Sequence, residues 1–152
     1  MRIKSTRFGE LDITESQLIQ FPHAIPGFPE EKEFALLPYQ PDSPFFFLQS
    51  LSEPDLTFVI AQPFGFFPDY NFAMDDAVAA ELGLSDDNKP QIFNIIRIPE
   101  IAEEMTANLL APILINTHTR QAIQIVLEKS HYTVRHRLFP QGLPAPTGKG
   151  GE

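Results

Sequence analysis

The chain has 152 residues, a net charge of −9, fifteen prolines, fourteen phenylalanines, no tryptophan and no cysteine. The lack of cysteine excludes disulfides and thiolate metal sites, and the acidic balance argues against direct binding to nucleic acid. A 43% hydrophobic composition is typical of a globular chain of one domain. Because we see no secretory signal and no apolar run that could span a bilayer, we expect a cytoplasmic protein without membrane contact.

The N-terminal half predicts short strands separated by turns. Residues 1–13 predict a β-hairpin around Gly9 and Glu10. A strand over 17–21 precedes a Pro-Gly turn at 25–28, in which Gly27 takes a positive φ. We expect one helical turn over 29–34. The remaining strands of this half are predicted over 33–39, 45–51 and 56–63.

The C-terminal half contains the one good helix. Its pattern covers residues 74–84, with Asp75 as N-cap and Gly83 as the stop. A strand over 91–98 leads into an acidic connector over 99–106. Two strands over 108–116 and 121–128 predict a second hairpin, and the last strand is expected over 132–139.

The run from Leu109 to Ile115 is apolar on both strand faces, yet Pro112 interrupts it. Proline removes a hydrogen bond from a strand ladder, so it belongs at a free edge or a bulge. We therefore expect both faces of this segment to be covered, with an edge or a bulge at Pro112.

Together these elements predict an all-β, mainly antiparallel fold. We expect a single domain over 1–139, built as a partly open β-barrel or sandwich with one short helix. The proline- and glycine-rich residues 140–152 cannot build a core and are predicted to form a disordered tail.

The sequence contains only partial matches to catalytic and metal-binding motifs. His131 and His136 have a spacing that could supply half of a zinc site, but they face opposite ways on a strand. His136 is better explained as a packed strand residue and His131 as an exposed one. The carboxylates of Asp75 and Asp76 are explained by capping of the helix. We therefore expect no enzyme activity, no metal and no cofactor.

Two acidic segments are candidates for binding a basic protein partner. One segment places the aromatic residues Phe67 and Tyr70 among three aspartates, which are Asp69, Asp75 and Asp76. Aromatic anchors surrounded by acidic groups suit a basic partner, although both rings could instead pack the loop onto the barrel. The other segment is the connector with its glutamates Glu100, Glu103 and Glu104, which could equally be a solvated loop.

Four stretches in order and spacing resemble the FliW family of flagellar assembly factors. They are "IPGFPEEKEFALLP" (25–38), "SPFFFLQSL" (43–51), "LTFVIAQPFGFFPDYNF" (56–72) and "TANLLAPILIN" (106–116). The resemblance covers residues 2 to about 138. Ala24 departs from the family pattern, which usually has glycine before "IPGF", so the backbone angles of that turn are in question.

The resemblance implies a non-enzymatic, β-barrel-like protein with two protein partners. One partner is CsrA, an RNA-binding translational repressor, and the other is flagellin. A member of this family sequesters CsrA when flagellin is scarce and is captured by flagellin when it accumulates. Composition leaves another reading open, a carbohydrate- or small-ligand-binding β-module, although the lack of tryptophan is unfavourable for a sugar platform.

Overall fold

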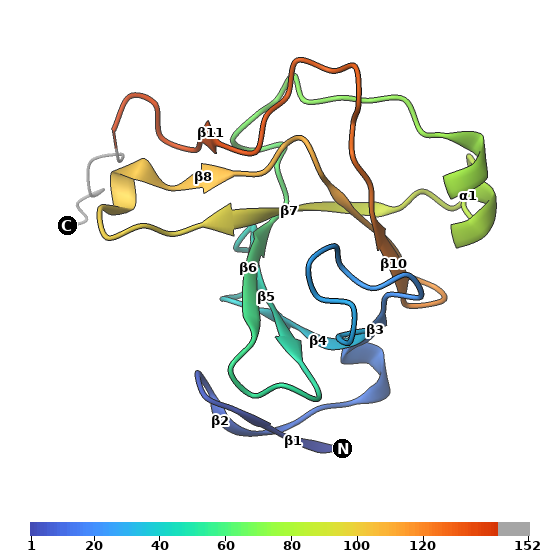
Figure 1. Ribbon diagram of the computed structural model, residues 1–152, viewed down its shortest axis with the longest axis vertical. Helices are drawn as coiled ribbons and strands as arrows, with labels where there is room; N and C mark the ends of the chain where they lie inside the picture. Colours follow the sequence, from blue (N-terminus) through green and yellow to red (C-terminus); the bar gives the residue numbers. More distant parts are fainter. Residues whose placement is uncertain (143–152) are drawn as a thin grey trace.

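The computed structural model describes residues 1–142, and short strands dominate it (Figure 1). In chain order the elements are β1 (Arg2–Ser5), β2 (Gly9–Asp12), η1 (Glu15–Gln17), β3 (Leu18–Gln20), β4 (Glu33–Pro38), β5 (Phe45–Ser50), β6 (Thr57–Ala61), α1 (Asp76–Leu82), β7 (Gln91–Arg97), η2 (Ala102–Glu104), β8 (Thr106–Ala107), β9 (Ile113–Asn116), β10 (Gln121–Gln124) and β11 (His136–Arg137). The predicted tail over 140–152 lies, from residue 143 onward, outside the described residues.

Seven strands close into a barrel. The order is β7-β6-β5-β4-β3-β10-β9, and β9 pairs back onto β7. Every pairing in the ring is antiparallel except that of β3 with β10, where Gln20 lies beside Gln121. The all-β prediction with one helix is confirmed, and the ring is complete rather than partly open because β9 has a neighbour on each side.

Three apolar clusters explain why several strands are apolar on both faces. The main cluster, which fills the barrel, consists of Ile19, Phe21, Ile25, Phe34, Leu48, Ile60, Phe93, Ile113, Ile115 and Ala122. Outside the barrel, β4 turns Ala35 toward the N-terminal hairpin, where Ile3 and Ile13 cover it. On the opposite side, β7 contributes Ile96 to a third cluster. Since successive side chains of a strand point to opposite faces, β4 and β7 each serve two clusters.

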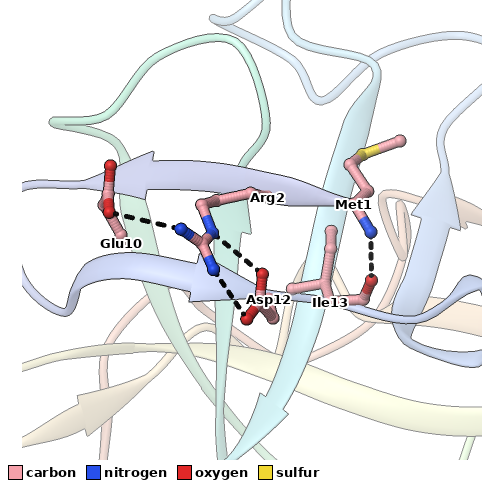
Figure 2. A network of polar contacts seen from close by, with 5 residues as sticks. All are labelled: Met1, Arg2, Glu10, Asp12 and Ile13. Carbon is pink, nitrogen blue, oxygen red and sulfur yellow. Dashed lines mark hydrogen bonds and ion pairs between the residues drawn. The ribbon is translucent and has the colours of Figure 1, made fainter.

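The predicted N-terminal hairpin forms, but its turn lies at residues 6–8, because Gly9 and Glu10 are paired with Ser5 and Lys4 in the ladder. Figure 2 shows how the open end of the hairpin is fastened. The Met1 amine donates to the carbonyl of Ile13 over 3.0 Å, and the Ile13 N–H donates back to Met1 over 2.7 Å. Arg2 adds a two-pronged contact with Asp12, from Nε at 3.0 Å and from Nη2 at 3.2 Å. This pair is exposed, so the backbone bonds and the buried Ile3 hold the hairpin more than the charges do.

Pro112 lies in an irregular stretch immediately before β9. Residues 108–112 stand between Ala107, opposite Ile96, and Ile113, opposite Phe93. Five residues therefore face two, so the ladder carries three extra residues. β9 itself is paired on both sides, so the prediction of a free edge was wrong. The alternative prediction of a bulge is confirmed, although this bulge has three extra residues and not the usual one. Both faces of the segment are covered, since Leu109 is 2% exposed and Leu114 is fully buried.

Two further expectations about local structure were wrong. Residues 29–34 form no helical turn, because the Lys32 carbonyl accepts from the N–H of Phe21 and the chain then enters β4. The strand predicted over 132–139 is reduced to β11. Before it, Thr133 accepts from Leu109 and Leu110 through its carbonyl, and its N–H donates to Nε2 of His136. These local bonds bend the chain away from a ladder.

Helix α1 begins and ends as its sequence predicts. The carboxylate of Asp75 accepts from the Ala77 N–H over 2.8 Å, and Gly83 takes a left-handed φ of 70°. The helix is fixed to the barrel by Asn116, whose Nδ2 donates to the Leu82 carbonyl over 2.6 Å. Leu82 is also the one buried residue of the helix. The helix therefore sits at the end of the barrel where β9 and β10 meet (Figure 1).

Candidate partner-binding surface

A long crossover, residues 62–75, connects β6 to α1 and runs above β7 (Figure 1). It starts with a turn in which the Pro63 carbonyl accepts from the N–H groups of Phe66 and Phe67. A second turn follows, closed by the Tyr70 N–H and the Phe67 carbonyl. These turns point some aromatic rings inward and leave others at the surface. The crossover thereby contains four of the eight residues that the sequence nominates for partner binding, which are Phe67, Asp69, Tyr70 and Asp75.

Tyr70 is not an exposed anchor. It is only 4% exposed, its hydroxyl donates to the Leu109 carbonyl over 2.7 Å, and it accepts from Nδ2 of Asn94 over 3.2 Å. Burial, as the largest cause, raises the pKa of Tyr70 to about 12. The reading in which this ring packs the loop onto the barrel is therefore correct for Tyr70.

Phe67 is intermediate in exposure. Its ring meets the imidazole of His136 edge-on, with centroids 6.1 Å apart. His136 also contacts Tyr132, and burial, followed by the nearby His131, lowers the pKa of His136. The prediction of a packed His136 and an exposed His131 holds, since His136 is half-buried as the first residue of β11 and His131 is exposed in the loop before it. Phe67 thus serves packing first and offers only part of its ring to a partner.

The acidic side chains of this region are all exposed. Between Phe64 and Asn88 the sequence contains no lysine or arginine. In the same stretch, the exposed carboxylates are Asp69, Asp75, Asp76, Glu81, Asp86 and Asp87. The Glu81 carboxylate contacts Nε2 of His23, and the other five carboxylates of this set are aspartates. The structure brings Asp86, which sequence reasoning missed, to the same groove as the predicted Asp76, and Asp87 is its exposed neighbour in the sequence.

An open groove of about 490 Å³ lies between the crossover, α1 and the loop that leads into β7. Its apolar lining includes Phe64, Phe72, Met74 and Leu84, while Asp76 is among its polar residues. Phe64 is 46% exposed, which makes it the prominent apolar side chain at this site. Nothing in the spacing of residues singles out Phe64 from its neighbours, but its place between Pro63 and Gly65 does indicate a turn.

The second predicted segment forms a separate surface around η2. Glu100, Glu103 and Glu104 are exposed, and so are Ile98 and Ile101, at 53% and 55%. The two isoleucines were not among the predicted contacts, although alternating apolar and acidic residues are visible in the sequence. We call these five residues the connector surface. It has the same chemistry as the groove, apolar side chains among carboxylates.

Strand β11 links the crossover to the connector surface. His136 contacts Phe67 at one end, and Nη2 of Arg137 donates to the Glu103 carbonyl over 2.9 Å at the other. The structure therefore joins the two predicted segments through two adjacent residues. A partner large enough to cover β11 could reach both segments at once.

The remaining chemistry is limited within the described residues. Nowhere in 1–142 do three His, Cys, Asp or Glu side chains gather in a way that could hold a metal ion. In the same range, no helix combines the length and the apolar character needed to cross a membrane. Two buried side-chain oxygens, Oδ1 of Asn94 and Oγ1 of Thr106, have no hydrogen-bond partner. Neither residue lines the groove.

The protein is therefore a small closed β-barrel. Its outer surfaces combine exposed apolar side chains with carboxylates, which is a chemistry suited to binding other proteins. The chain belongs to the FliW family, whose family model, described as "FliW protein", matches residues 2–138. A flagellar assembly factor FliW of Desulfitobacterium hafniense is 49% identical over the whole length of both chains. Its counterpart in Bacillus subtilis is 41% identical and covers 91% of this chain and 96% of its own.

A crystal structure of the flagellar assembly factor FliW has the same fold. It superposes with a TM-score of 0.84 at 38% identity, and the match covers 92% of this chain and 98% of the other. The family resemblance carried by the four sequence stretches is therefore confirmed. At this level of identity the likeness extends to the family and not to the fold alone.

Proposed function

We propose that this chain acts in flagellar assembly as a protein-binding regulator with two competing partners, CsrA and flagellin. The observation that carries the proposal is the match to curated flagellar assembly factors, which at 49% identity extends over the entire chain. Free factor sequesters CsrA, so that flagellin mRNA is translated. Flagellin that accumulates captures the factor, and CsrA then represses translation again.

The surface chemistry supports this role. CsrA must present basic groups to bind RNA phosphates, and a protein with a net charge of −9 attracts such a partner. Exposed apolar residues beside carboxylates, such as Ile101 beside Glu100 and Glu103, supply both contact area and charge. The factor itself makes no direct contact with nucleic acid and performs no catalysis.

Inhibition of CsrA has two possible routes. The factor could cover the RNA site directly, or it could bind beside that site and repel RNA through its carboxylates. The family resemblance favours the second route, because acidic groups next to a basic cleft lower RNA affinity without using the same contacts. Both partners are present where flagellin is made, so we place the protein in the cytoplasm.

A competition pull-down tests the proposal. The purified chain is immobilised, CsrA or flagellin is bound, and the other protein is added. We expect each partner to be retained alone and each to displace the other. Retention of neither protein would exclude the proposed function and would make the alternative, a small-ligand-binding β-module, the reading to pursue.

Calorimetry with single charge reversals tests the two predicted segments. Asp69→Lys probes the crossover and Glu103→Lys probes the connector surface, and both side chains are exposed, so the fold is preserved. We expect weaker binding of CsrA by at least one of them, with the difference growing at low salt. Unchanged affinity for both variants would remove these segments as CsrA contacts.

A further inference from the structure

The groove beside α1 has the chemistry of a docking site for a positively charged amphipathic segment. Its lining is mainly apolar and comes from three separate parts of the chain, the crossover, α1 and the loop before β7. We infer that this groove binds a basic amphipathic segment of a partner protein. Apolar side chains of that segment insert between Phe64 and Leu84, and its lysines or arginines lie against Asp76 and Asp86. This inference rests on the proposed function.

The charged residues around the groove determine whether a basic or an acidic segment can bind there. Asp76 and Asp86 line it directly, and Asp75 and Asp87 are their exposed sequence neighbours. Among the lining side chains the one basic residue is Lys89. An acidic segment would be repelled here, whereas a basic one gains attraction at the edge and apolar contact at the centre.

The polar groups of the groove argue against a small orienting ligand. Specific small-molecule sites carry convergent polar groups that fix the ligand. Here the Tyr70 hydroxyl is already bonded to Leu109 and Asn94. The carboxylate of Asp75 caps α1. The exposed lining is mainly apolar, and Phe64, which is 46% exposed, is its natural anchor. Apolar anchors with a charged edge are the pattern by which amphipathic segments are recognised.

The framework of the groove is rigid enough to select a shape. Asn116 fastens the C-terminal end of α1 to β9 over 2.6 Å. On the opposite wall, Tyr132 accepts from the Asn71 N–H over 3.1 Å and donates to the Asn71 carbonyl over 3.2 Å. The α1 wall is therefore fixed to the barrel and the crossover wall to the loop before β11, so a docked segment meets a preformed site with little ordering cost.

Two groove variants and two matched controls test the inference by calorimetry, with CsrA and flagellin as the probes. Asp76→Lys/Asp86→Lys reverses the edge charge, and its control Glu15→Lys/Glu128→Lys makes the same change in net charge at exposed sites outside the groove. Phe64→Ala removes the anchor, and its control Tyr39→Ala removes an aromatic ring that is 56% exposed elsewhere. Thermal unfolding confirms that each variant is folded.

We expect both groove variants to weaken binding of at least one partner about tenfold or more, while the controls change it less than about twofold. If the wild type binds its partners and the groove variants bind them equally well, the groove inference is wrong while the proposed function stands. If the wild type binds neither partner, both fail together. A wild-type dimer that Phe64→Ala converts to a monomer would show that a second copy covers the groove, and would also overturn the inference.

Discussion

The hydroxyl of Tyr70 donates to the backbone carbonyl of Leu109 over 2.7 Å. This bond fastens the crossover to the irregular stretch 108–112, which carries the three extra residues of the ladder. Asn94 completes the arrangement, since its Nδ2 donates both to the Tyr70 hydroxyl and to the Asn108 carbonyl. The backbone groups of the irregular stretch that contains Pro112 are thus satisfied partly by side chains and partly by backbone, since the Leu110 and Pro112 carbonyls accept from the N–H groups of Leu127 and Ile125. Through the bond from Tyr70 to Leu109, the same stretch holds the crossover in place over the barrel.

Tyr70→Phe is expected to lower the free energy of unfolding by about 1–2 kcal/mol, because the buried Leu109 carbonyl and the Asn94 amide both lose a partner while the ring stays in place. Chemical denaturation measures the change. Tyr39→Phe is the control, since Tyr39 is 56% exposed, and it should change stability by less than about 0.5 kcal/mol. Equal effects of the two variants would contradict the importance of the Tyr70 bond.

The stability of the wild type should fall between pH 10 and 12 in a way that Tyr70→Phe does not share. The pKa of Tyr70 is raised from 10.0 to about 12 by burial, so the folded state holds the phenol proton more tightly than the unfolded state. The contribution of Tyr70 to the free energy of unfolding is therefore complete below pH 10 and is lost as the pH rises through 12. Denaturation midpoints measured across this pH range show the loss of stability. If the midpoints of wild type and Tyr70→Phe fell in parallel with pH, the prediction would be refuted.

Ala24→Gly is expected to raise the free energy of unfolding by up to about 1 kcal/mol. Ala24 has a φ of 61°, so it keeps the left-handed conformation that glycine adopts without steric cost. Relief of that cost exceeds the added entropy of glycine in the unfolded chain. The control is Ala80→Gly at an exposed position inside α1, which should cost about 1 kcal/mol. Two equally destabilised variants would mean that the turn carries no strain.

Asn116→Ala should destabilise the protein by about 2–3 kcal/mol. The side chain is 1% exposed and makes three bonds, to the Leu82 carbonyl and from the N–H groups of His118 and Thr119. Amide hydrogen exchange in α1 should accelerate more than in β4 and β5, because the helix loses its attachment to the barrel. The exposed Asn71 serves as control, and Asn71→Ala should leave exchange in α1 unchanged.

Local signals in the sequence predicted the features that depend on neighbouring residues. The Asp75 cap, the Gly83 stop and the positive φ of Gly27, which is 91°, are each decided within a few residues, and all are confirmed. The apolar character of both faces of the run from Leu109 to Ile115 likewise predicted a segment covered on both sides. Such features need no knowledge of the distant chain.

The features that sequence reasoning missed depend on contacts far along the chain. Tyr70 is buried because Asn94 and Leu109, 24 and 39 residues away, supply its hydrogen bonds. The strand expected over 108–116 is shortened because β7 fixes two different registers on either side of residues 108–112. The groove depends on residues from three segments, of which sequence reasoning singled out only the crossover and the start of α1. Hydrophobic periodicity carries no information about such registers.

The parallel pairing of β3 with β10 sets the order in which this protein can be assembled. The Arg120 carbonyl accepts from the Gln20 N–H, and Nε of Arg120 donates to the Leu18 carbonyl, across 100 and 102 positions of sequence. A growing chain that stops before β9 has bare strand edges on both β3 and β7, and such edges invite pairing with other chains. Completion of the ring is thus a late step in synthesis, and C-terminal truncations before Gln124 should yield aggregates rather than a smaller folded protein.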